Sequence, residues 1–446
     1  MAGGFSPLDE ELGLLPQIVL TPTLAESAVR LGSWLPFAVA AEMLAHFTHT
    51  QVSESTLTRL TEQAGAAYVA VQEGQAARLA QGERGVEEAG PPLQQVSVDG
   101  AMVPLVHKVW VEAKTLAIGT VQPPKHKLDG TVEIQTSALS YFSRVAEWHA
   151  FSDQASIETV RRGTLSAGTV VGVVDGATWE QDFLDEQCAA AVRILDWPHA
   201  VGYLAKVAHA LYGVDTPEST TWLAAQKEML LHGDPQAVLA KLRGLQEDLA
   251  GQAADGQPPP AALGVVTESL DYLAARADQL RYAVFRAAGY PIGSGAVESA
   301  NKLLVQARLK GAGMHWARAH VNPLLALRGM ACSDRWEEGW PQVSTQWRVA
   351  ARAATLAHRQ QRQAARAAAR QTGEDQDTPS ASTPARATPV LASTAALLPD
   401  CPPALTAPPT PPAVPRRTLP ASRRPAPTHP WRRQLLHRAP PPHPEM

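Results

Sequence analysis

Three carboxylates stand in sequence settings that could support chemistry. Asp99 lies in Val-Ser-Val-Asp-Gly, Asp175 in Val-Gly-Val-Val-Asp-Gly-Ala, and Glu298 in Gly-Ser-Gly-Ala-Val-Glu-Ser. Two aspartates on strands and one glutamate on a helix suggest a divalent-metal site for phosphodiester chemistry, which commonly uses two ions about 3.5 to 4 Å apart. Oxygen ligands suit Mg²⁺ or Mn²⁺, and a few carboxylates suffice because Mg²⁺ keeps several waters.

Each carboxylate also has an interpretation without a metal. Asp99 begins an Asp-Gly pair that could form a hairpin turn, although the strand pattern continues over residues 101–106 and favours an aspartate inside the strand. Asp175 could cap the following helix, and Glu298 alone could be an ordinary helical glutamate. An aspartic protease would use Asp-Thr/Ser-Gly and would leave Glu298 without a role. The separations of 76 and 123 residues do not decide whether the three side chains meet.

The segments that must position the carboxylates alternate between strand and helix from residue 94 on. Strand patterns cover residues 95–106, 109–121, 139–146, 169–175 and 191–197, and helical patterns cover residues 149–162 and 199–212. The run before Asp175 is continuously apolar, as in a strand buried on both faces. Three β-type runs followed by helix, strand, helix, strand and helix is the order of an α/β fold with an RNase H-like catalytic core.

Helical patterns flank and interrupt this core. Residues 1–90 predict an all-helical N-terminal region, and residues 37–49 and the run from Ser53 have helix-turn-helix proportions. Two packed helices without DNA contact are an equal alternative, because Arg59 is the one obvious phosphate contact there. The core is expected in two parts, residues 91–213 and 289–340, separated by a helical insertion over residues 214–288.

The helix expected over residues 296–310 would carry Glu298. Its apolar stripe is expected to contain Val297, Ala300, Leu304 and Ala307. Glu298, Asn301 and Lys302 are expected on another face, at spacings of three and four residues. One face would pack while the other offers a carboxylate and a cation to a site.

Charge is distributed unevenly along the 446 residues. The chain has a net charge of −4, yet residues 341–446 carry 14 Arg against 5 Asp or Glu, so the preceding residues are strongly acidic. A basic helix over residues 348–370 and a disordered Pro- and Arg-rich tail from residue 371 are expected. The acidic body counts against a broad DNA-binding footprint, which would have to come from local patches and the tail.

Other sequence features concern the compartment. The three cysteines are too far apart for a CxxC ligand pair, which favours a reducing cytoplasm. The N-terminal residues lack the basic and apolar regions of a signal peptide, and no stretch approaches the roughly 18 apolar residues of a spanning helix. We expect a soluble cytoplasmic protein without a membrane partner.

An ordered series of motifs resembles one family. The motifs are Val-Asp-Gly-Ala at 98–101, Trp-Val-Glu-Ala-Lys at 110–114, Val-Asp-Gly-Ala-Thr-Trp at 174–179, Ile-Leu-Asp-Trp-Pro-His at 194–199, Gly-Ser-Gly-Ala-Val-Glu-Ser at 293–299 and Arg-Leu-Lys-Gly-Ala-Gly-Met-His-Trp at 308–316. Together they resemble bacterial insertion-sequence transposases of the Kra group, DDE enzymes with an RNase H-like core. The likeness covers roughly residues 5–340 and, faintly, His-Pro-Trp-Arg-Arg at 429–433.

The resemblance implies that Asp99, Asp175 and Glu298 are the catalytic, metal-binding triad, holding Mg²⁺ or Mn²⁺, with two ions expected. It implies strand cleavage at the terminal inverted repeats of an element and transfer of the freed 3′-hydroxyl into target DNA. Lys302 is expected to hold a phosphate by charge, and Arg308 and Lys310 are further candidates for backbone contacts. The expected partners are double-stranded DNA and further copies of the chain assembled on it, in a cytoplasmic, nucleoid-associated setting.

Two departures from the family pattern keep an alternative open. Relatives often carry an N-terminal extension with zinc-type cysteine pairs, and this chain begins close to where that part would end. After Asp175, where the family tends to have apolar aromatics, this chain has Glu180 and Gln181. The alternative is a truncated or repurposed copy that binds DNA without cutting it.

Overall fold

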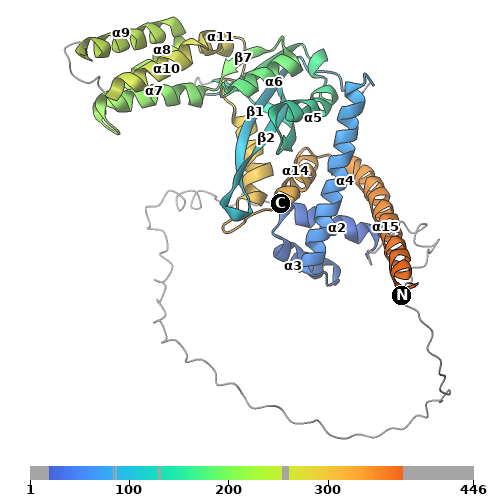
Figure 1. Cartoon of the computed structure of the whole chain (residues 1–446). Coiled ribbons are helices and arrows are strands. Elements are labelled where there is room, and N and C mark those ends of the chain that lie inside the picture. Colours follow the sequence, from blue (N-terminus) through green and yellow to red (C-terminus); the bar gives the residue numbers. More distant parts are fainter. Residues whose placement is uncertain (1–19, 84, 86–87, 129–131, 254–260, 375–446) are drawn as a thin grey trace, which may run out of the picture. The chain divides into compact units, whose positions relative to one another are not determined.

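The computed structural model describes residues 20–83, 85, 88–128, 132–253 and 261–374 (Figure 1). All of these residues belong to one compact unit, which spans Met1–Gln376. The tail expected from residue 371 lies outside the described residues from position 375 on. Residues 371–374 instead belong to the end of a long helix, α15 (Trp336–Glu374).

A five-stranded mixed sheet lies at the centre of the described chain. In spatial order its strands are β5 (Thr136–Arg144), β2 (Trp110–Val121), β1 (Leu93–Pro104), β6 (Thr169–Val174) and β7 (Val192–Leu195). The pairs β5–β2 and β2–β1 are antiparallel, whereas β1–β6 and β6–β7 are parallel. The expected strands are confirmed to within a few residues, and the fold belongs to the α/β class. A separate two-stranded ladder joins β3 (Lys125–His126) to β4 (Val132–Glu133).

Alternation along β1 divides the core between the two faces of the sheet. Val96 and Val98 pack with Phe151 and Phe183 on the face covered by α5 (Trp148–Arg161) and α6 (Thr178–Cys188). Ala101 and Val103 pack on the opposite face, against α12 (Gly295–Ala300) and α14 (Arg318–Cys332). Asp99 has the same parity as Ala101 and Val103, so its side chain belongs to the face that carries the Glu298 helix.

The N-terminal helices share a core with the end of the described chain. These are α2 (Pro22–Trp34), α3 (Phe37–Thr48) and α4 (Glu54–Ala80), which pack with α14 and the first turns of α15 (Figure 1). Ser53 is the N-cap of α4, as expected, and its hydroxyl accepts the Thr56 N–H at 3.2 Å. Leu60 of α4 and Trp347 of α15 are buried in the shared core, so the boundary expected at residues 340–341 falls inside a helix.

A helical insertion separates β7 from the Glu298 helix. It follows α7 (Trp197–Tyr212) and contains α8 (Pro217–His232), α9 (Pro235–Ala253), α10 (Ala261–Ala274) and α11 (Tyr282–Ala287). The described residues between 214 and 288 are therefore mainly helical. Leu204, Leu242 and Leu270 form one apolar cluster with Val171 of β6 and Ile194 of β7. The insertion therefore packs directly on the parallel edge of the sheet. The remaining helical turns are η1 (Val106–Lys108), η2 (Thr164–Ser166) and η3 (Ala277–Leu280).

The helix that carries Glu298 contains a π-helical segment. α12 runs into the π-helix η4 (Asn301–Gln306) and then into α13 (Ala307–Leu309). A π turn holds more residues than an α turn, so it rotates the following residues relative to the expected stripe. Ala307, expected on the packed face, is exposed, whereas Arg308 is buried.

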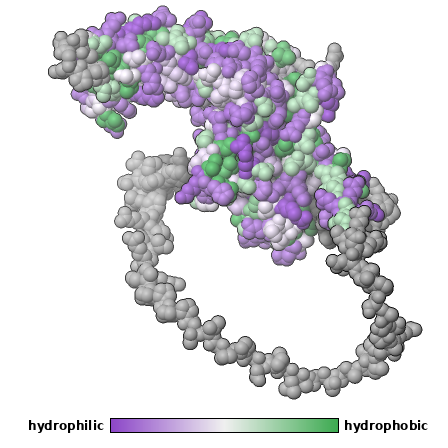
Figure 2. All heavy atoms as spheres, viewed as in Figure 1, coloured by the Kyte–Doolittle hydropathy of each residue, from purple (hydrophilic) through white to green (hydrophobic). Residues whose placement is uncertain are grey.

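The surface of the described residues is mainly polar. Figure 2 shows that hydrophilic residues predominate over the helical insertion. Among the described helices, none combines the length and the apolarity needed to cross a bilayer.

Candidate metal centre

Asp99 and Asp175 lie at equivalent levels of two neighbouring parallel strands. β1 pairs with β6 at a constant offset of 76 residues, for example Val96 with Gly172. The same offset carries Asp99 to Asp175, although the pairing itself ends at Val96. Since the carboxyl ends of parallel strands meet at one edge of the sheet, the two side chains converge there. The hairpin-turn alternative for Asp99 is excluded, because the residue pairs with Thr115 of β2 within the strand.

A third carboxylate joins them, and it is Glu180. Oxygen atoms of Asp99, Asp175 and Glu180 all lie within 4.8 Å of one another. Glu180 is in the first turn of α6 and is only 1% exposed. Its Oε2 accepts the Gly176 N–H at 3.1 Å, while the Ala177 N–H donates to Asp175 Oδ1 at 2.9 Å. The turn after Asp175 thus holds both side chains through its main-chain donors.

Burial, together with the close approach of these acids, raises the pKa of Glu180 and of Asp99. Burial is the main cause that raises the pKa of Glu180 to about 10, and the hydrogen bond to Asp175 and the charges of Asp175 and Asp99 add to it. Burial also raises the pKa of Asp99, opposed by the Gly100 N–H and Asn301, and assisted by repulsion from Asp175 and Glu298. Without a cation, the carboxyl groups of Glu180 and Asp99 therefore favour their protonated forms. A bound cation would favour the ionised forms.

Glu298 lies near Asp99 without belonging to the tight group. It is exposed in the first turn of α12, and its charge acts on Asp99. One turn later Asn301 is buried, and its Nδ2 donates to Asp99 Oδ2 at 2.8 Å. Asn301 Oδ1 is buried with no hydrogen-bond partner among the described residues. Asn301 therefore faces the site and the core, unlike its expected place on the same open face as Lys302.

Asp196 fixes the entry to the Glu298 helix. It directly follows β7, is 2% exposed, and its Oδ1 accepts the Ser294 N–H at 2.7 Å. Its Oδ2 accepts the His199 N–H at 3.0 Å and so caps α7. The Trp197 N–H donates to Ile292 O at 2.9 Å beside it. These contacts tie the end of β7 to the start of α12.

The helical insertion holds the main chain at Asp175. The Tyr272 hydroxyl donates to the Asp175 carbonyl oxygen, and the Arg276 guanidinium donates to the Gly176 carbonyl oxygen at 2.6 Å from Nη2 and 3.2 Å from Nε. Arg276 also stacks on the Tyr272 ring, which stacks on Tyr203 of α7 with ring centroids 4.0 Å apart. The insertion therefore contributes directly to the position of a candidate ligand.

The other expected site residues differ in exposure. Lys302 and Lys310 are exposed and remain candidates for phosphate contacts. Arg308 differs from the expectation: it is 1% exposed, its Nε donates to Gly32 O at 3.1 Å, and its guanidinium lies over the rings of Phe37 and Trp316. The π-helical segment turns Arg308 inward, so in this structure it packs and cannot reach a phosphate.

His199 lies near Asp175, whereas Trp316 pairs with Pro104 at the end of β1. His199 Nε2 lies 4.0 Å from Asp175 Oδ2 and its side chain is half exposed, so a substrate-facing position is open to it. Trp316 is 9% exposed and its Nε1 donates to Leu309 O at 3.0 Å, as expected of a buried anchor. His315 is exposed beside it.

The side chains present fit a hard divalent cation. The donors are carboxylate oxygens with one buried amide oxygen nearby, the donor type that Mg²⁺ and Mn²⁺ prefer. Burial raises the pKa of Asp99 and repulsion by Asp175 and Glu298 adds to the rise, so a bound cation would favour the ionised form of Asp99. Asp99 and Asp175 would be the shared ligands, and Glu180 and Glu298 the two available flanking carboxylates.

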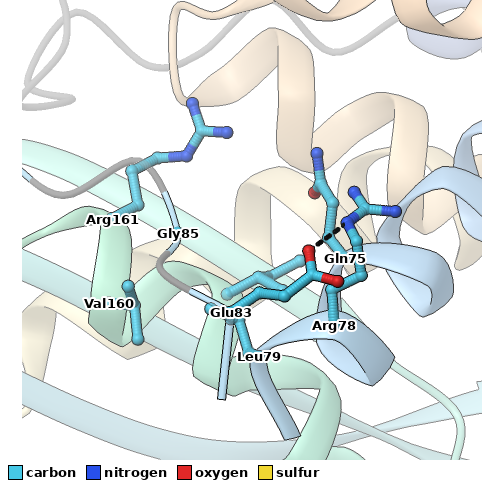
Figure 3. A pocket seen from close by; sticks show the side chains of 8 residues that line it. Gln75, Arg78, Leu79, Glu83, Gly85, Val160 and Arg161 are labelled. Atoms are coloured by element: carbon cyan, nitrogen blue, oxygen red, sulfur yellow. Dashed lines mark ion pairs between the residues drawn. The ribbon is translucent and has the colours of Figure 1, made fainter. Parts of the chain in front are cut away.

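A separate pocket lies between α4 and α5, away from these carboxylates (Figure 3). Gln75, Arg78 and Leu79 line it from α4, and Val160 and Arg161 line it from α5. An ion pair joins Arg78 Nε to Glu83 Oε2 at 3.6 Å. None of the metal-centre residues contributes to it, so we assign it no part in the chemistry.

Comparisons with known proteins add no identification. No family model matches the chain, and no curated protein matches its sequence.

Sequence reasoning missed Glu180, Asp196, Tyr272 and Arg276. Glu180 had a usable signal, because it is spaced three and four residues from Phe183 and Leu184 on the buried stripe of α6. A glutamate on the apolar stripe of a helix that directly follows an Asp-Gly turn predicts a buried acid close to that aspartate. Tyr272 and Arg276 gave no signal, since their contact with the sheet depends on how the insertion folds back.

Proposed function

We propose that the protein is a DDE transposase that cleaves DNA strands at the ends of a mobile element and joins the freed 3′-hydroxyl to target DNA. The observation that carries the proposal is the convergence of Asp99 and Asp175 at matching levels of adjacent parallel strands, with Glu298 on the flanking helix. The strand order β5-β2-β1-β6-β7 supports an RNase H-like core, in which such a site belongs at this edge.

The residues of the site would have three roles: metal binding, orientation of the metal ligands and contact with phosphates. Asp99, Asp175 and Glu298 would hold Mg²⁺ or Mn²⁺, and we propose two ions. When bound, the ions would activate the attacking oxygen and neutralise charge on the leaving oxygen. Asn301 orients the Asp99 carboxylate, and the Gly176–Ala177 turn orients Asp175 and Glu180. Lys302 and Lys310, exposed on the same helical stretch and just after it, would position phosphates without reading sequence.

The setting follows from the substrate. Terminal inverted repeats and target DNA are duplexes, so the protein would act on the nucleoid in the cytoplasm. Two element ends must be brought together before joining, and we propose that at least two copies of the chain assemble on them. The helical insertion would help to shape the site, because its Tyr272 and Arg276 hold the Asp175 turn.

The test is nicking of a duplex that carries the inverted repeats flanking the gene, in Mg²⁺ or Mn²⁺. We expect cleavage at the repeat boundary by the wild-type protein and at least a thousandfold less by Asp175→Ala. Asp248→Ala, in an exposed position on α9, is the matched control and should cleave normally. Duplex binding without cleavage in either metal would favour the alternative of a copy that binds DNA without cutting it.

A further inference from the structure

Arginines line one face of the exposed part of α15. Arg348, Arg352, Arg359, Arg362 and Arg366 are separated by four, seven, three and four residues. At about 100° per residue these five positions fall within about 80° of the helix circumference. Arg348 is half-buried and the other four are exposed. The face, which we call the arginine face, extends over about 27 Å at 1.5 Å per residue.

No acidic residue accompanies this face on its own helix. Between Glu338 and Glu374 the sequence contains no Asp or Glu. Like charges four residues apart, such as Arg362 with Arg366, destabilise a helix instead of supporting it. A helix that merely needed a soluble surface would mix both signs, so this arrangement has a cost that a polyanion would offset.

The rest of the exposed helix does not fit a membrane surface. The positions opposite the arginine face are mainly Ala and Gln, and the large apolar side chains exposed on α15 within the described residues are Val349 and Leu356. Membrane-surface helices bury large apolar residues such as Trp, Phe and Leu. Planar guanidinium groups match phosphate in a bidentate geometry, which favours a phosphate backbone.

A further basic residue lies on α4, which packs beside α15 (Figure 1). Arg59 of α4 and His358 of α15 line the same groove between the two helices. Arg59 was the one obvious phosphate contact in the helix pair with helix-turn-helix proportions. Because Arg59 lies beside α15, the helix pair α3–α4 has basic residues of α15 as neighbours.

We propose that the arginine face, together with Arg59, binds the phosphate backbone of duplex DNA independently of its sequence. Duplex DNA carries one charge per about 1.7 Å of its axis, so a face of this length can contact several phosphates. This surface would anchor the substrate away from the metal centre and give the acidic body its local basic footprint. The proposal depends on the proposed function only for the choice of DNA as the polyanion.

The test measures binding of a fluorescent 30-base-pair duplex to the full chain from 50 to 300 mM NaCl. The variant Arg359→Gln, Arg362→Gln, Arg366→Gln removes three charges from the arginine face. Each phosphate contact contributes about 0.9 to the slope of log K against log salt, so we expect the slope to fall by about 2.7 and the affinity to fall at least tenfold at 150 mM. Glutamine keeps the helix propensity, which circular dichroism checks.

A matched control removes the same charge elsewhere. Lys227→Gln, Lys241→Gln, Arg243→Gln changes three exposed cations of α8 and α9 and should bind within twofold of wild type. Equal losses in both variants, or no loss in the first, would overturn the proposal. So would a first variant that loses binding to phosphatidylserine vesicles or to duplex RNA while binding DNA normally.

The same measurement separates this proposal from the transposase proposal. Asp248→Ala, exposed on α9, should bind the duplex like wild type, because Asp248 belongs neither to the arginine face nor to the metal centre. If cleavage proves absent from the wild-type protein while the arginine variant still loses binding, the transposase proposal fails and the surface stands. If cleavage occurs but the variant binds normally, the surface proposal fails alone.

Discussion

The Tyr272 hydroxyl donates a hydrogen bond to the main-chain carbonyl of Asp175, although the two residues are 97 positions apart. Tyr272 is in the last turn of α10, and Asp175 directly follows the strand β6. Through this bond and the neighbouring bonds of Arg276 to Gly176, the helical insertion takes part in the metal centre. The helical insertion is therefore not a separate appendage, because it supports the candidate metal ligand Asp175.

The variant Tyr272→Phe should therefore weaken metal binding more than it weakens the fold. Loss of one hydrogen bond costs about 1 kcal/mol of unfolding free energy. Freed movement of Asp175 should raise the Mn²⁺ concentration needed for half-maximal cleavage about tenfold, which corresponds to about 1.4 kcal/mol. Tyr212→Phe on α7 is the control, and it should leave the metal titration unchanged. Equal metal titrations for Tyr272→Phe and wild type would show that the bond has no positioning role.

The turn at Gly176 should tolerate no side chain. Its φ is +90°, and a Cβ there would lie 2.6 Å from Arg276 Nε and 2.7 Å from the Tyr272 hydroxyl oxygen. Gly176→Ala should lower the free energy of unfolding by about 1–3 kcal/mol, because the backbone is strained and the two bonds must lengthen. Gly202→Ala, in α7 with nothing within 4 Å of the added carbon, should instead be neutral or stabilising. Urea denaturation of both variants measures the difference.

Buried Glu180 should make the metal-free protein less stable as the pH rises. Its pKa is about 10 in the folded chain against an ordinary value of 4.5, so the folded state binds more protons between these values. The free energy of unfolding then falls with rising pH in that window, by up to about 1.4 kcal/mol per unit. Glu180→Gln cannot ionise and should flatten the fall between pH 6 and 9 in EDTA. Parallel pH profiles for the two proteins would contradict the assignment.

Much of this architecture could be predicted from the sequence, because its signals are local. The apolar run ending at Asp175 and the β-type run through Asp99 identified two strands, and their separation of 76 residues equals the observed register offset. The equal separation predicts that the two aspartates lie side by side only if the two strands are already known to be parallel neighbours. The π-helical segment had no local signal, and it accounts for the buried position of Arg308, which follows it. The contacts of Tyr272 depend on long-range packing, which periodicity does not encode.

Glu298 and Glu180 can be distinguished as ligands by heat denaturation with and without Mn²⁺. A cation that binds only the folded state stabilises it by about 2.7 kcal/mol at a hundred times its dissociation constant, so wild type should melt several degrees higher with Mn²⁺. Asp99→Asn should lose this rise. Glu298→Gln should reduce it, while Glu180→Gln should keep most of it, because Glu180 is already neutralised in the fold by burial and by Asp175. Glu268→Gln, exposed on α10, should respond like wild type. The reverse order, with the rise lost in Glu180→Gln and kept in Glu298→Gln, would make the third ligand Glu180 and would remove Glu298 from the triad.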